Sequence, residues 1–259
     1  MKNWMSSAAF AAFATANAGA GITSELYLTA GDQGNVWVVQ GTGVNRSWVM
    51  ATGNREYPIA VADEVRTLGG ADPDVGAEYT LAGVDTGTRY NFPAGISSAW
   101  DGTTDLVNNY LLDFGTGTVY QTGLDWSSPT PLFTVGGGNY LGITYDFSDD
   151  TLWVSGWSQG IVEHRSLGGA LLGSFATPFS SISCLALDDV TGTLWMGTQA
   201  QQGTFFQYSK AGASMGSVFI EELVTQNTLG GEFRAVVPEP ATLLVVGVGL
   251  LALVSRRRR

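Results

Sequence analysis

Short runs of apolar and β-branched residues alternate with turn-forming clusters of Gly, Asp, Asn and Ser along most of the chain. In one stretch Ile143 and Tyr145 are separated by a polar residue, so both side chains face the same side of a strand. Residues 147–150 then supply a turn, and residues 152–154 form a second strand. Strands this short, joined by polar turns, predict an all-β domain.

The arrangement of strands recurs with a period of about 40 residues. Residues 143–146 and 151–154 match residues 185–188 and 193–196 at a shift of 42. Weaker copies lie towards the N-terminus, so that five units fit, beginning near residues 26, 59, 98, 143 and 182. Several short strands in a repeat of this length are typical of a four-stranded propeller blade. The pattern therefore predicts a small β-propeller of about five blades over residues 21–222; the alternative is a β-sandwich, which also has short alternating strands.

The segment that follows the last unit is different. Residues 223–231 contain no strand pair that matches the earlier units. We interpret residues 223–236 as a spacer between the repeat domain and the C-terminal segment.

Both ends of the chain are apolar. Residues 1–20 resemble a secretory signal peptide, with Lys2 near the start and a small-residue apolar stretch after it. Either Ala16-Asn17-Ala18 or Ala18-Gly19-Ala20 offers the small-x-small pattern at which such peptides are cleaved. At the other end Pro238-Glu239-Pro240 precedes the apolar run 241–254, and Arg256 to Arg259 close the chain.

The C-terminal run is short for a membrane helix, but its flanks favour one. At about 1.5 Å per residue it spans roughly 21 Å, against roughly 30 Å for a bilayer core. The cluster Arg256, Arg257, Arg258 and Arg259 cannot be buried in a protein core, whereas it suits the cytoplasmic side of a membrane. We therefore expect a transmembrane helix over 241–254, with the preceding chain outside the cytoplasm.

The tripeptide, apolar run and terminal arginines of residues 237–259 together resemble the PEP-CTERM sorting signal of exported bacterial proteins. The resemblance implies exosortase as the processing partner, with Pro238, Glu239 and Pro240 as the sorting motif and Arg256–Arg259 as the membrane-stop cluster. It also implies a Gram-negative, polysaccharide-producing host, which makes extracellular polysaccharide a candidate partner. The same tail family is also called the ice-binding protein C-terminal domain, but the threonines here form no ladder that would support ice binding.

Charge and cysteine content narrow the classes of partner and site. The chain has 12 Lys and Arg against 23 Asp and Glu, a formal net charge of −11. So acidic a protein is repelled by nucleic acid phosphates and by anionic lipid surfaces. Cys184 is the single cysteine and His164 the single histidine, so an intramolecular disulfide and a zinc site with several cysteines are both excluded.

Aspartates recur near the end of the first strand of several units. Asp146 and Asp188 occupy equal positions, and Asp63 and Asp101 lie at similar places in earlier units. Aspartate stabilises tight turns through its own backbone, and this role explains the recurrence. No cofactor is predicted; calcium, which prefers carboxylate oxygens, is the alternative, with Asp146 and Asp188 as weak candidate ligands.

No catalytic set is apparent in the sequence. Glu163-His164-Arg165 places three ionisable groups in a row, but on a strand the histidine faces away from the other two. No Gly-x-Ser-x-Gly elbow occurs, and paired carboxylates cannot be identified by spacing.

Tryptophans are the candidate ligand-contacting residues. Trp37, Trp153 and Trp195 recur at the same strand position, which favours packing between blades. Four others do not follow the repeat and are better candidates for an exposed binding surface: Trp48, Trp100, Trp126 and Trp157.

The sequence therefore predicts an exported, non-enzymatic protein of the cell surface or extracellular matrix, first anchored in the inner membrane and then processed. A secreted propeller hydrolase or lyase acting on carbohydrate or lactone is the alternative.

Overall fold

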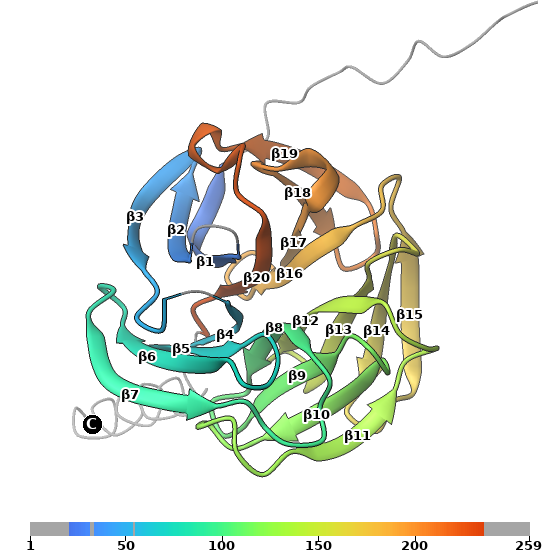
Figure 1. Cartoon of the computed structure of the whole chain (residues 1–259). Coiled ribbons are helices and arrows are strands. Elements are labelled where there is room, and N and C mark those ends of the chain that lie inside the picture. The colour runs from blue at the N-terminus through green and yellow to red at the C-terminus, as the bar shows by residue number, and fades with distance from the viewer. Residues whose placement is uncertain (1–20, 32–33, 54, 236–259) are drawn as a thin grey trace, which may run out of the picture.

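The computed structural model describes residues 21–31, 34–53 and 55–235, and these form five four-stranded antiparallel sheets. The sheets are arranged around a central axis as the blades of a propeller (Figure 1). We call the region between the five innermost strands, in which side chains such as Asp101 are buried, the channel. The predicted all-β fold with five blades is confirmed.

Each blade places one strand at the channel and one at the periphery (Figure 1). The innermost strands are β20, β4, β8, β12 and β16, and the outermost are β3, β7, β11, β15 and β19. The elements are β1 (Ile22–Ala30), β2 (Asn35–Gly41), β3 (Gly43–Val49), β4 (Glu56–Val61), β5 (Glu64–Gly69), β6 (Val75–Thr80), β7 (Asp85–Asn91), β8 (Ala99–Thr104), β9 (Asn109–Asp113), β10 (Thr118–Thr122), β11 (Thr130–Thr134), β12 (Tyr140–Asp146), β13 (Thr151–Gly156), β14 (Ile161–Ser166), β15 (Leu171–Ala176), β16 (Ile182–Asp188), β17 (Thr193–Thr198), η1 (Gln199–Gln201), β18 (Thr204–Ser209), β19 (Ser214–Phe219), η2 (Glu221–Leu223) and β20 (Thr228–Phe233).

The first blade is closed by the last strand. Its order is β20-β1-β2-β3, with Leu26 opposite Phe233 and Leu28 opposite Gly231. The interpretation of residues 223–236 as a spacer is therefore wrong. In residues 223–235 no neighbouring strand forms a hairpin with β20, and its partner β1 lies about 200 residues earlier in the chain.

The closure also shifts the first repeat unit by one strand. Strands β1 and β2 are the second and third strands of their blade, so Trp37 on β2 is not equivalent to Trp153 on β13 or Trp195 on β17. The packing role of these residues still holds, since Trp153 and Trp195 are 3% and 1% exposed. Trp195 shares a core cluster with Leu28 of the neighbouring blade, while Trp37 packs against that cluster.

The predicted end segments lie outside the described residues. These are the signal peptide 1–20, the sorting motif and membrane-stop cluster, and the transmembrane helix 241–254. Within the described ranges, no helix has the length and apolar character needed to cross a bilayer.

Candidate ligand-binding site

Every innermost strand carries an irregularity near its second residue. The register of the ladder shifts between Glu56 and Ile59 on β4, and shifts occur at the matching place on β8, β12, β16 and β20. A bulge of this kind inserts an extra residue and re-aims a side chain. Side chains from four of these positions line one pocket at the end of the channel where the innermost strands begin, namely Tyr57, Trp100, Leu141 and Leu229.

The second strands contribute to the same end of the channel. The residue directly after each second strand is Gly31, Gly70, Phe114, Trp157 or Gln199, in blade order. The last three line the pocket. The two glycines leave space for the Tyr57 ring, because a Cβ atom on Gly70 would lie 2.4 Å from a carbon of that ring, and one on Gly31 would lie 2.8 Å from another.

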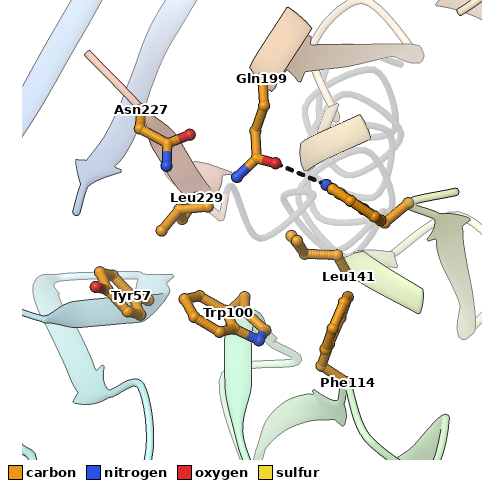
Figure 2. Close-up of a pocket in the computed structure, with 8 residues that line it drawn as sticks. Tyr57, Trp100, Phe114, Leu141, Gln199, Asn227 and Leu229 are labelled. Carbon is orange, nitrogen blue, oxygen red and sulfur yellow. Dashed lines mark hydrogen bonds between the residues drawn. The ribbon is translucent and has the colours of Figure 1, made fainter. Parts of the chain in front are cut away.

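The pocket, which we call the cup, encloses about 310 Å³ and combines an aromatic side with a polar side (Figure 2). The Tyr57 and Trp100 rings stack with centroids 4.9 Å apart. Phe114 meets Trp100 edge-on at 6.1 Å and Trp157 edge-on at 6.2 Å. These rings form a continuous arc along the wall of the cup.

Two carboxamides lie across the cup from Tyr57 and Trp100 (Figure 2). The Trp157 Nε1–H donates to Gln199 Oε1 over 2.8 Å, so the amide nitrogen of Gln199 remains as a donor towards the cup. Asn227 precedes β20, and its side-chain oxygen is buried without a hydrogen-bond donor among the described residues. The lining contains no Asp, Glu, Lys, Arg, His or Cys.

Asp101 lies deeper in the channel and joins four of the five blades. Its side chain is fully buried, and its two oxygens accept four backbone N–H bonds. The donors are Gly102 at 2.9 Å, Gly231 at 3.0 Å, Leu185 at 3.1 Å and Ile143 at 3.2 Å. Burial raises the pKa of Asp101 well above its usual range, and the four N–H donors act in the opposite direction.

Further along the channel, threonines repeat this cross-linking between blades. Thr103 on β8 accepts the N–H of Tyr145 at 3.0 Å, and Thr144 on β12 accepts that of Leu187 at 3.1 Å. Thr144 also donates to Glu232 of β20 at 3.3 Å. Burial raises the pKa of Glu232 well above its usual range, with the nearby Asp101 carboxylate adding to the effect.

The other recurring aspartates, Asp63, Asp146 and Asp188, have separate partners at the end of the channel opposite the cup. Asp146 accepts from Lys210 Nζ at 2.6 Å and from Trp153 Nε1 at 3.0 Å. Burial alone would raise the pKa of Asp146, but Lys210 and the other donors hold it below its usual value.

The other aspartates of the set do not join Asp146 in one site. Asp188 accepts from Ser24 at 2.9 Å and from the N–H of Val190 in its own turn at 3.0 Å. Asp63, with a side chain 90% exposed, pairs with Arg234 at 3.1 Å. The predicted turn bonds occur at Asp146, which accepts the Ser148 N–H, and at Asp188. The turn-forming role is wrong for Asp101, whose carboxylate is buried and bonds to other blades.

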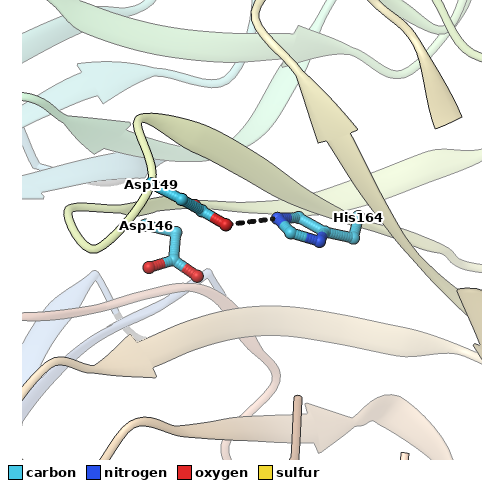
Figure 3. A group of neighbouring side chains, drawn as sticks. All are labelled: Asp146, Asp149 and His164. Atoms are coloured by element: carbon cyan, nitrogen blue, oxygen red, sulfur yellow. Dashed lines mark ion pairs between the residues drawn. The ribbon is translucent and has the colours of Figure 1, made fainter. Parts of the chain in front are cut away.

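One group of possible metal ligands occurs among the described residues, namely Asp146, Asp149 and His164 (Figure 3). His164 Nε2 lies 3.5 Å from Asp149 and 2.6 Å from the Thr151 hydroxyl, and its ring stacks on Trp153. Because Lys210 already neutralises Asp146, the donor set fits an internal polar network better than a bound cation.

The Glu163-His164-Arg165 run behaves as the alternation predicts. Arg165 pairs with Glu163 at 2.7 Å on one face, while His164 stacks on Trp153 at 4.2 Å on the other. The three groups do not converge.

Only part of the cup lies among the residues expected from the sequence. Of the four tryptophans expected at an exposed surface, Trp100 and Trp157 line the cup, whereas Trp126 is fully buried and Trp48 packs against the core. Four residues that also line the cup were not expected from the sequence, namely Tyr57, Phe114, Gln199 and Asn227. A signal existed for two of these, since Phe114, Trp157 and Gln199 follow one another at shifts of 43 and 42 residues.

Comparisons with known proteins identify the tail and the fold. A model described as the PEP-CTERM protein-sorting motif matches residues 236–259. No curated protein matches the chain.

Solved structures share the architecture at low sequence identity. A chain in the crystal structure of a nidogen/laminin complex has a TM-score of 0.58 and 10% identity, over 82% of this chain and 99% of that one. A protein of unknown function from Bacteroides caccae has a TM-score of 0.50 and 14% identity, over 76% and 73%. Such likeness shows the fold alone. The chain is thus a five-bladed β-propeller that carries a PEP-CTERM protein-sorting motif at residues 236–259, the mark of an exported protein targeted to exosortase.

Proposed function

We propose that this exported protein is a non-enzymatic binding protein of the cell surface or extracellular matrix, and that its ligand occupies the cup. The observation that carries the proposal is the lining, which offers four aromatic rings, two carboxamides and two leucines. Binding pockets are mostly apolar with a few oriented polar groups, and the volume lies at the small end of the usual range of roughly 300–1,000 Å³.

The lining contains no carboxylate, imidazole, amine or thiol, and its one titratable side chain is the Tyr57 phenol, which favours binding over catalysis. General acid–base chemistry needs a titratable group within hydrogen-bond reach of the substrate. The carboxyl groups nearer the channel axis, Asp101 and Glu232, are buried and bonded to the strands around them. Among the residues that the structure describes, no comparable feature supports the alternative hydrolase or lyase.

The path of the chain supports a role at the envelope. Strand β1 begins at Ile22, two residues after the predicted signal peptide, and β20 ends at Phe233, five residues before Pro238. Cleavage at either predicted site therefore leaves all twenty strands in place.

The cup and the C-terminal end of the described chain lie at opposite ends of the propeller. Strand β20 runs from Leu229 in the cup to Phe233 at the far end of the channel, and Ala235 then bonds to Val61. The described chain therefore ends, at Ala235, at the end of the propeller opposite the cup, and the matched sorting motif begins at the next residue.

The test is to express the full chain in an exosortase-bearing host and to measure how much processed protein stays with the envelope or matrix. We expect Trp157→Ala and Gln199→Ala to release the protein into the medium, while Gln201→Ala, an exposed glutamine of the same turn, behaves as wild type. Thermal unfolding of each variant separates loss of the cup from loss of the fold. Equal retention of all variants, or chemical conversion of the bound ligand by purified protein, would contradict the proposal.

A further inference from the structure

We infer that the ligand of the cup is a neutral carbohydrate. This inference rests on the proposed function, because it takes the cup to be the ligand site and adds the chemical class that fits it.

The two sides of the cup match the two kinds of surface on a sugar ring. A pyranose presents apolar C–H groups on its faces and hydroxyl groups around its edge. The arc from Tyr57 through Trp100 and Phe114 to Trp157 supplies flat apolar surface for the faces. An aliphatic ligand would use this arc but not the amides opposite.

The two amides supply N–H donors to the edge. Gln199 Oε1 is held by Trp157, which leaves Nε2 to donate. In Figure 2 the Asn227 nitrogen points towards the side of the cup that holds Leu229 and Tyr57, whereas the Asn227 oxygen is buried. A sugar hydroxyl accepts from N–H donors, so hydroxyls around one ring can bond to both amides.

Charge selects against acidic sugars and against cations. The lining offers no cationic side chain to a uronic acid, and the chain carries a net charge of −11, which repels anions. A quaternary ammonium would bind the aromatic rings, but it would find no carboxylate in the lining and would leave both amides unused.

The experiment uses the full chain purified in a detergent without a sugar head group. Neutral oligosaccharides of glucose, galactose, mannose and N-acetylglucosamine are titrated in parallel with oligogalacturonate, choline and a tryptophan-containing peptide amide. Tryptophan fluorescence and saturation-transfer NMR report binding, since Trp100 and Trp157 line the cup.

We expect at least one neutral oligosaccharide to bind, with affinity weakened about 10-fold by Gln199→Ala, as for loss of one neutral hydrogen bond. Trp157→Ala should weaken it by about 10-fold or more, and Gln201→Ala should leave it unchanged. Binding of choline, oligogalacturonate or the peptide in preference to every neutral sugar overturns the inference, as does neutral sugar binding that Trp157→Ala and Gln199→Ala leave intact. If no neutral sugar binds in this way but Trp157→Ala and Gln199→Ala still release the protein from the envelope, the inference fails and the proposed function stands with another ligand. If these variants also leave envelope retention unchanged, the inference and the proposed function both fail.

Discussion

Asp101 is the side chain on which closure of the ring depends most directly. Its Oδ1 accepts from Gly102 and Gly231, and its Oδ2 accepts from Ile143 and Leu185, so all the acceptor positions of the carboxylate are used. Three of the donors belong to other blades, including the closing strand β20.

The change Asp101→Asn keeps the shape of the side chain but places an NH₂ group against two of these N–H donors. Each buried donor that loses its acceptor costs about 1–3 kcal/mol, so the free energy of unfolding should fall by about 2–6 kcal/mol. For a domain of this size, a loss of about 4 kcal/mol corresponds to a fall in Tm of about 8–16 °C.

Urea unfolding followed by tryptophan fluorescence, together with thermal unfolding by circular dichroism, measures both quantities. The control is Asp63→Asn, since that side chain is 90% exposed and the change should stay within about 0.5 kcal/mol of wild type. If Asp101→Asn were as stable as this control, the carboxylate would not hold the inner strands together.

Two further predictions concern the closing strand and the end of the channel opposite the cup. A chain that ends after Ala235 should unfold at the same temperature as the processed protein. A chain that ends before β20 should not fold, because β1 and Asp101 lose their partners on that strand. Circular dichroism and proteolysis distinguish the two chains, and a stably folded shorter chain would contradict closure of the ring by β20. Burial, followed by the nearby Asp146 carboxylate, raises the pKa of Asp189 to about 7, so its contribution to stability is complete below about pH 4 and is lost as the pH rises to 7. Asp189→Asn should therefore be more stable than wild type at pH 8, by about 1 kcal/mol once solvent screening of this partly exposed carboxylate is included. At pH 4 the variant should show no such gain. An equal difference in the free energy of urea unfolding at both pH values would contradict this prediction.

The repeat could be recognised from sequence because each blade is built mainly from local hairpins. Strands such as β12 and β13 pair with Ile143 opposite Val154, so that their pattern lies within about 15 residues. The sorting tail was equally accessible, since its tripeptide, apolar run and arginines are contiguous. The aspartate turns followed from the habit of that side chain to bond its own backbone, as at Asp188 and Val190.

Long-range pairing, by contrast, left little trace in the local pattern. Three of the last four residues of β20 are glycine or glutamate, which is unlike a strand. Its partner lies about 200 residues away, so the local sequence held no hairpin signal for this strand. The same holds for Asp101, whose turn-like appearance in the sequence concealed a buried role that depends on donors from three other blades.

Sequence alone thus determined the all-β repeat, the approximate number of blades and the export address, because each is encoded in consecutive residues. The tertiary structure alone decided which strand closes the ring and which side chains form the cup. Bulges on the innermost strands turn Tyr57, Trp100 and Leu229 towards one point, and that convergence depends on five blades meeting around an axis.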